Sequence, residues 1–187
     1  MGNQYQELQM FKLPKGFRGK GAVVVQLWWI VQGSLFAWSP QFMYSWRNAL
    51  LRLFGAKIGR GVIIRPSAKI TYPWKVSIGD YSWIGDDVVI YSLGEITIGD
   101  NSVISQKSYL CGGGHDHTRK AFDIFSKPIH IGSEVWLGTD VFVAPGINIG
   151  KGAVVGARSS VFKDIQSGSM NYGYPCRYQS ARVMKEG

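Results

Sequence analysis

The 187-residue chain has little charge and very little cysteine for its length. Charged residues make up 18% of it and hydrophobic residues 45%, which is typical of a folded chain rather than a disordered one. Its two cysteines, Cys111 and Cys176, are too few for a disulfide framework, and neither has a second ligand at metal-site spacing. We therefore expect reduced thiols and a cytoplasmic protein.

Acidic residues are scarce in the first third of the chain. Residues 1–60 contain eight Lys and Arg but only Glu7 as an acid, and the formal net charge of the whole chain is +9. Basic ends of this kind can meet the phosphates of a cofactor or an anionic membrane surface. No nucleic-acid-binding motif accompanies them, so we expect no nucleic-acid partner.

The sequence also lacks the run of about 20 apolar residues that a transmembrane helix requires. Its first ten residues are polar, unlike a secretory signal, and the apolar stretch 21–38 is interrupted by glutamine, glycine and serine. We expect two helices, within residues 22–36 and 41–54, that pack on the first turn of the fold and cover its open end. The tryptophans and basic residues of this segment leave a peripheral contact with the inner membrane face as an alternative.

An aliphatic residue recurs every six positions from residue 58 onward, with two short phase shifts and one long interruption. Glycine or another small residue often follows it, and glycine, asparagine or aspartate at a corner suits a turn with positive φ. The period predicts a triangular coil of about four to five rungs, because each step supplies one short strand and one corner. The alternative fold is a β-sandwich, but its strands vary in length more than a regular period of six allows. The inward residues are Ile58, Ile64, Ile70, Val76, Ile78, Ile84, Ile90, Ile96, Ile98, Ile104, Leu110, Ile131, Leu137, Val143, Ile149, Val155 and Val161.

The long interruption, residues 111–128, carries two of the three histidines. Its three consecutive glycines should weaken strand order, and loops on a rigid scaffold commonly hold functional residues. An imidazole can remove the proton of a hydroxyl nucleophile, so His115 and His117 are both candidate bases. Asp116 and Asp123 are candidates to orient the imidazole. His130 lies between two inward isoleucines and should point outward.

The order Gly114-His115-Asp116, then Lys127-Pro128-Ile129 and Ile131-Gly132-X-X-Val135-Trp136-Leu137-Gly138, resembles the hexapeptide-repeat O-acetyltransferases. The similarity is greatest to the group associated with colanic acid and other exopolysaccharide synthesis, and it covers residues 56–180. It implies a mainly β fold, a left-handed parallel β-helix with an N-terminal helical segment and a protruding loop. The implied divisions are a helical cap at 1–55, the β-helix at 56–165 with its catalytic loop at 111–128, and a tail at 166–187.

The resemblance further implies direct transfer of an acetyl group from acetyl-CoA to a hydroxyl of a sugar or polysaccharide precursor, with no metal required. The family's catalytic base aligns with His115, and its oxyanion donor with the backbone N–H of Thr139. Trp136, expected to pack close to His115, joins Thr139 in the CoA groove together with Ala157, Lys163 and Arg177. The galactoside enzymes' acceptor-binding Asn and Asp are missing here, so the acceptor candidates are Asp86, Tyr91, Ser92 and His117.

The resemblance also implies a homotrimer, with each site in a cleft between neighbouring coils. Such an assembly would bury the outward aromatic residues Tyr81, Trp83, Tyr91 and Trp136. Two other functions stay open. A metal enzyme resembling γ-class carbonic anhydrases would need the three histidines gathered around Zn²⁺ at a subunit boundary. A non-enzymatic β-helix scaffold would need neither a histidine-bearing loop nor basic cofactor positions.

Overall fold

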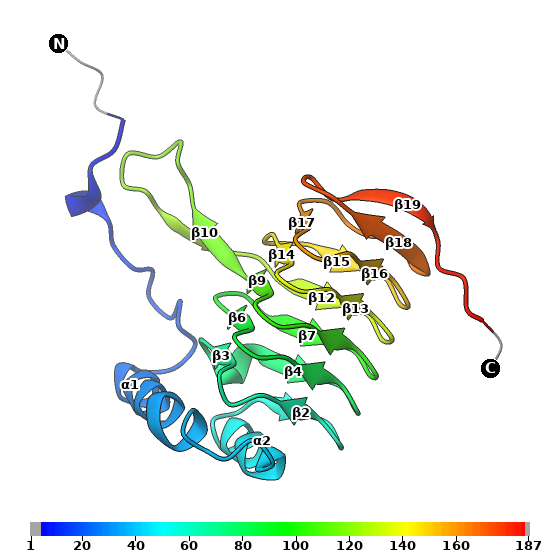
Figure 1. Ribbon diagram of the computed structural model, residues 1–187. Coiled ribbons are helices and arrows are strands. Elements are labelled where there is room, and N and C mark those ends of the chain that lie inside the picture. Colours follow the sequence, from blue (N-terminus) through cyan, green and yellow to red (C-terminus); the bar gives the residue numbers. More distant parts are fainter. Residues whose placement is uncertain (1–4, 186–187) are drawn as a thin grey trace.

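The chain folds into a three-sided parallel β-helix whose first turn is covered by two helices (Figure 1). The computed structural model describes residues 5–185; residues 1–4 and 186–187, the outermost parts of the two predicted terminal segments, lie outside the described residues. The expected fold class is confirmed: a mainly β parallel coil with a short helical segment before it and one projecting loop.

Each face of the coil is one sheet of short strands, and together they form five complete rungs and a partial sixth. Sheet A contains β1 (Lys57–Ile58), β4 (Val76–Ile78), β7 (Ile96–Ile98), β12 (Ile129–Ile131) and β15 (Asn148–Ile149). Sheet B contains β2 (Ile63–Ile64), β5 (Trp83–Ile84), β8 (Val103–Ile104), β13 (Trp136–Leu137), β16 (Val154–Val155), β18 (Ser169–Tyr172) and the antiparallel β19 (Arg177–Ala181). Sheet C contains β3 (Lys69–Ile70), β6 (Val89–Tyr91), β9 (Tyr109–Cys111), β14 (Phe142–Val143) and β17 (Ser160–Val161).

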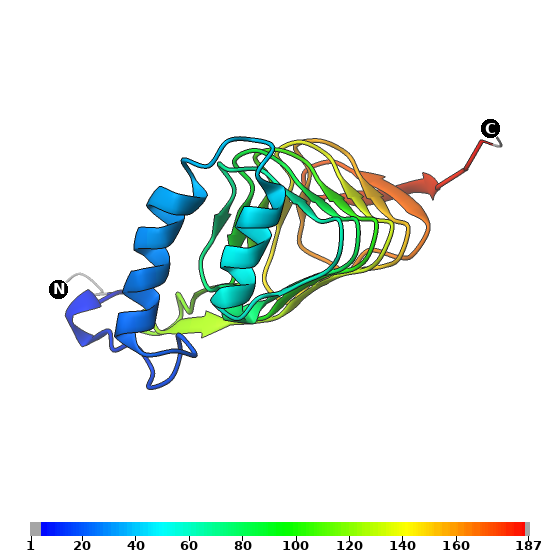
Figure 2. The same ribbon diagram turned by 90° about the horizontal axis from the view of Figure 1, so that it is seen from below.

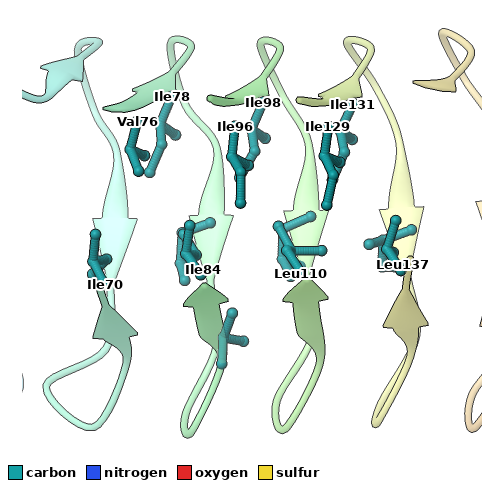
Figure 3. Packing of buried hydrophobic residues seen from close by; sticks show 14 of the residues in the cluster. Ile70, Val76, Ile78, Ile84, Ile96, Ile98, Leu110, Ile129, Ile131 and Leu137 are labelled. Carbon is teal, nitrogen blue, oxygen red and sulfur yellow. The ribbon is translucent and has the colours of Figure 1, made fainter. Parts of the chain in front are cut away.

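The strand register places equivalent residues of successive rungs directly opposite each other. Ile64 pairs with Ile84, and Ile84 pairs with Ile104, so each inward side chain rests on the equivalent one a turn earlier. Figure 3 shows such columns of aliphatic side chains filling the prism. These side chains are almost completely removed from water, and their close packing holds the rungs together.

Every insertion in the repeat falls at one corner, the C/A corner, where the chain leaves sheet C for sheet A. The short phase shifts lie at residues 71–75 and 91–95, and the long interruption lies at the same corner one rung later. There β10 (Gly113–His115) pairs antiparallel with β11 (Ile124–Ser126) in a hairpin that projects from the coil (Figure 1). The glycines were expected to weaken strand order, and that expectation is wrong. A Cβ at Gly113 would lie 2.5 Å from the Phe125 carbonyl oxygen, so glycine lets the two strands approach closely.

The helical cap closes the first rung, as Figure 2 shows from below. It consists of α1 (Ala22–Val31), a π-helical turn (Gln32–Phe36) and α2 (Tyr44–Leu53), which lie within the expected ranges. One cap side chain donates to the exposed edge of each sheet, which satisfies carbonyls that would otherwise lack partners. The bonds run from Arg52 to Ile58 in sheet A at 3.0 Å, from Arg47 to Ile64 in sheet B at 2.7 Å, and from Trp28 to Ile70 in sheet C at 2.7 Å.

Two short 3₁₀ turns complete the described elements, Leu8–Met10 near the N-terminus and Pro73–Lys75 at the C/A corner. Across residues 5–185, no helix combines the length and the apolar character needed to cross a bilayer.

Candidate active site

His115 ends strand β10 on the projecting hairpin, where its imidazole is exposed. Its Nδ1 lies 2.7 Å from the backbone carbonyl oxygen of Phe122. Because a carbonyl oxygen can only accept a hydrogen bond, Nδ1 must carry the proton in the neutral ring. Nε2 therefore presents a free lone pair to the surroundings, which is the state that a general base requires.

Two phenylalanines hold the imidazole of His115. The Phe122 ring stacks on it with centroids 4.4 Å apart and an interplanar angle of 5°, and the Phe11 ring lies 5.8 Å away in a tilted contact. Phe122 has a φ of 53°, a left-handed conformation that is uncommon outside glycine, and this turn carries its carbonyl oxygen toward the imidazole. The N-terminal segment is tied to the same loop, since Glu7 N–H donates to the Lys120 carbonyl at 2.8 Å.

Neither aspartate expected to orient the histidine contacts it among the described residues. Asp116 accepts the N–H and O–H groups of Thr118 at 2.9 and 2.6 Å, and these bonds lower the pKa of Asp116. Asp123 pairs with Arg119 at 2.6 Å. The orienting group is instead the backbone carbonyl of Phe122. His117 is exposed on the same loop, near enough to Asp116 to contribute to its lowered pKa.

Thr139 and Ala157 lie on consecutive rungs at the corner between sheets B and C, which we call the B/C corner. The two rungs touch closely here, because a Cβ at Gly138 would lie 2.7 Å from the Ala157 nitrogen. Among the hydrogen bonds of residues 5–185, none uses the Thr139 N–H as donor, whereas its carbonyl accepts from Arg158 at 2.8 Å. The Thr139 amide is therefore free to donate to a ligand.

Trp136 is half exposed on sheet B, where its Nε1–H donates to the Ser105 hydroxyl at 3.0 Å. Within the part of the chain that the structure describes, the ring contacts of His115 are with Phe11 and Phe122, so Trp136 does not pack against His115 in a single chain.

The two basic residues expected in the CoA groove lie together. Lys163 and Arg177 line one groove of about 580 Å³ at the C-terminal end of the coil, along with Asn171 and Cys176. Both basic side chains are exposed, and neither forms an ion pair among residues 5–185. They could therefore meet phosphate oxygens.

The acceptor candidates do not converge in one chain. Asp86 bonds Arg65 at 2.9 Å and Ser67 at 3.1 Å in a groove on sheet B. Tyr91 packs against Tyr109 on sheet C, with ring centroids 5.9 Å apart, and burial raises the pKa of Tyr91.

The third acceptor candidate, Ser92, is fully buried. Its hydroxyl accepts from the Tyr72 N–H at 2.8 Å and donates to the Tyr72 carbonyl at 3.1 Å. That hydroxyl is already satisfied at the C/A corner.

The three histidines of the chain do not gather at one point, since His115 and His117 share the hairpin loop and His130 lies on β12. His130 points outward from β12, and its Nδ1 lies 2.8 Å from the Thr97 hydroxyl. Over residues 5–185, no three His, Cys, Asp or Glu side chains converge as metal ligands would.

His115 and Thr139 stand at opposite edges of sheet C. The His115 hairpin follows β9 at the C/A corner, whereas Thr139 precedes β14 at the B/C corner. A base and an oxyanion donor must both lie about 3 Å from the reacting groups. One chain alone does not bring these two groups together.

The outer side of sheet C, between these two corners, carries a continuous row of aromatic rings. We call it the aromatic ladder. Its successive ring centroids are 5.9, 6.2, 5.8 and 6.4 Å apart, through Tyr91, Tyr109, Phe142, Phe162 and Tyr174. Burial raises the pKa of Tyr109 to about 12.

The coil and its histidine hairpin place the chain in the class of hexapeptide-repeat β-helix proteins. The family model for the hexapeptide repeat of succinyl-transferase matches residues 75–106 and 128–162. WcaF of Escherichia coli K12, assigned to colanic acid biosynthesis as an acetyltransferase, is 62% identical over 181 residues, which span 97% of this chain and 100% of the relative. Galactoside O-acetyltransferase of the same organism is 34% identical over 134 residues, 70% of this chain and 66% of the relative.

Solved structures agree. A hexapeptide-repeat acetyltransferase of Vibrio cholerae in complex with acetyl coenzyme A superimposes with a TM-score of 0.78 and 25% identity, covering 89% of this chain and 92% of that one. A galactoside acetyltransferase in complex with coenzyme A gives a TM-score of 0.77 and 27% identity, covering 92% and 85%. The chain belongs to the hexapeptide-repeat acetyltransferase family, and its enzyme class is that of the acyl-CoA-dependent acetyltransferases.

Proposed function

We propose that the chain transfers an acetyl group from acetyl-CoA directly to a hydroxyl of a sugar or polysaccharide precursor, with His115 as general base. The observation that carries the proposal is the bond from His115 Nδ1 to the Phe122 carbonyl, because it leaves Nε2 unprotonated and outward. The saccharide acceptor is supported by the relatives, which are named for colanic acid biosynthesis and for galactosides.

The proposed reaction is one addition followed by one elimination. The acceptor hydroxyl gives its proton to Nε2 of His115 while its oxygen attacks the thioester carbonyl. The carbonyl oxygen becomes an oxyanion that the free N–H of Thr139 stabilises. The intermediate then expels the CoA sulfur, which takes the proton from the imidazolium. An acetyl ester and CoA result, and His115 returns to its neutral state.

Donor binding uses the B/C corner and the C-terminal end of the coil. Ala157 is small and exposed, so the pantetheine arm can lie against the backbone beside it. Trp136 offers a half-exposed ring on the adjoining sheet. Lys163 and Arg177, which share one groove, would meet the phosphates. Asp86, Tyr91 and His117 remain acceptor candidates within this proposal.

The site is completed by a homotrimer. Three triangular prisms arranged around an axis with sheet C inward place the C/A corner of each chain beside the B/C corner of its neighbour. This brings His115 of one chain to Thr139 of the next, which one chain does not achieve. The same arrangement removes the three aromatic ladders from water at the axis, a strong driving force for association.

The test of the base is thioester consumption from acetyl-CoA with sugar acceptors. His115→Ala should lower kcat by about 10²–10⁴-fold, because a general base contributes that much. His130→Ala is the matched control and should keep most of the activity, because His130 points outward from β12 and bonds Thr97. Turnover of His115→Ala at the wild-type rate would refute the role of His115, and a selective loss in His117→Ala would move the role to that residue.

A further inference from the structure

The helical cap is apolar both where it packs on the coil and where it faces solvent. Its inner face is buried against the coil, where Val25, Trp28 and Phe36 have no exposed surface. Its outer side, which we call the cap face, exposes large apolar side chains. Trp38 is 86% exposed, Phe42 78% and Val23 72%, and Leu27, Ile30 and Leu35 accompany them. Three of these side chains lie on α1, one on the π-helical turn and two in the connection to α2. So many exposed apolar side chains in one short segment exceed what scattered surface residues account for.

A groove of about 420 Å³ adjoins the cap face, since the exposed Leu35 and Trp38 also line it. It lies between the π-helical turn and α2, and its walls come mainly from Leu35, Trp38, Met43 and Trp46. Trp46 is anchored by its Nε1–H, which donates to the Leu35 carbonyl at 3.0 Å. An apolar groove bordered by indoles suits an acyl chain, with the indole rings at the level of the lipid headgroups.

Charge is arranged around this face rather than on it. Residues 21–46 contain no Asp, Glu, Lys or Arg. Exposed lysines precede and follow the cap, namely Lys12, Lys15, Lys20 and Lys57, and the only acid in the first 60 residues is Glu7. An apolar face flanked by cations fits an anionic bilayer. A second copy of the cap would instead bring like charges together.

We propose that the cap face docks on the surface of a bilayer that contains anionic lipids. The helices lie flat on the coil end and stay there, because Trp28 donates to the Ile70 carbonyl and Gln32 accepts from the Ile70 N–H at 2.6 Å. The apolar side chains enter the boundary between headgroups and acyl chains, while the lysines meet the lipid phosphates. The cap thus contacts the bilayer through its cap face, without crossing it.

The proposed trimer strengthens this contact, and this part of the inference rests on the proposed function. Parallel coils grouped around one axis place all three caps at the same end of the assembly. Three weak contacts with one flat surface then act together, because each bound cap raises the effective concentration of the others.

The test is flotation of the full-length protein with phosphatidylcholine vesicles, with and without phosphatidylglycerol. The wild-type chain should float with the anionic vesicles and much less with the neutral ones. Val23→Glu and Trp38→Glu should each weaken binding by about tenfold or more, because each places a charge on the apolar face. Val183→Glu is the matched control, since Val183 is 83% exposed on the C-terminal tail, and it should bind like the wild type.

Replacing Lys12, Lys15 and Lys20 together with glutamine should reduce the preference for anionic vesicles, and added salt should do the same. Circular dichroism and acetyl-CoA turnover of each variant report folding and catalysis separately, so binding can fail while the enzyme works, or the reverse. Equal binding by Val23→Glu and Val183→Glu would overturn the proposal. Failure of the wild-type chain to float with either kind of vesicle would overturn it as well. Sedimentation that shows the cap face pairing with a second copy, with no vesicle binding, would overturn it too.

Discussion

Replacing Arg47 with alanine should lower the free energy of unfolding by about 2–4 kcal/mol, although the residue lies outside the coil. The guanidinium has no exposed surface and donates to the Ile64 carbonyl at 2.7 Å, to Ser39 at 2.7 Å, and to the carbonyls of Pro40 and Gln41 at 2.9 and 2.6 Å. The alanine variant leaves the buried Ile64 carbonyl without a donor, which costs about 1–3 kcal/mol. The three half-buried acceptors can be partly hydrated and add about 1 kcal/mol together.

The assay is urea unfolding at one fixed chain concentration, followed by tryptophan fluorescence, because oligomer stability depends on concentration. Arg60→Ala is the control, since Arg60 forms an exposed pair with Asp80 at 2.8 Å that solvent screens, so its loss should change stability little. Equal losses in Arg47→Ala and Arg60→Ala would refute the reasoning that side-chain donors from the cap satisfy the edge of the first rung.

Three further predictions concern sheet C, the hairpin and the donor groove. Burial raises the pKa of Tyr109 from 10.0 to about 12, so the folded state resists its ionisation. Stability should be full below pH 10 and fall as the pH rises toward 12, and Tyr109→Phe should reduce that fall in thermal unfolding. Phe122→Val should lower kcat more than Phe122→Gly, because a β-branched residue resists the left-handed φ that turns the carbonyl to His115; equal losses would count against this orienting role. Lys163→Gln and Arg177→Gln should each raise the KM for acetyl-CoA about tenfold with little change in kcat, and an unchanged KM would remove them from the groove.

Most of the coil could be predicted from the sequence because its physical rule is local. An inward aliphatic residue every six positions specifies strand, corner and core at once, and Ile64, Ile84 and Ile104 are all buried as the period required. The phase shifts could be seen in the sequence. Their shared position at the C/A corner could not, because it depends on which sheet each short strand joins in the folded coil. The predicted four to five rungs compare with five complete rungs and a partial sixth.

The surroundings of the site were harder to predict from the sequence. The partner of His115 is a backbone carbonyl, which any residue carries, so no pattern of side chains could identify Phe122. Phe11 lies more than a hundred positions away in the sequence and reaches the imidazole only through the fold. Arg47 would be expected at the surface by its charge, and its burial depends on four acceptors, one on the first rung and three between the helices.

The aromatic residues illustrate the same limit. Four were expected to be buried at trimer contacts, and of these Tyr91 belongs to the aromatic ladder that the proposed trimer would bury. Trp83 and Trp136 lie on sheet B, and Tyr81 lies at the corner between sheets A and B. Alternation in a strand indicates which residues point outward, but which face of the prism they occupy follows only from counting corners through the insertions.

The central claim, a site shared between two chains, is tested most directly by mixing two inactive variants. One variant, His115→Ala, lacks the base but keeps its groove. The other variant, Ala157→Trp, keeps the base but has its groove at the B/C corner blocked. Co-expression with two different tags allows trimers that contain both chains to be purified. If His115 of one chain works on the groove of its neighbour, one of the three junctions in each mixed trimer is intact, and about a third of the wild-type activity should return. Mixed trimers as inactive as either parent would contradict the account.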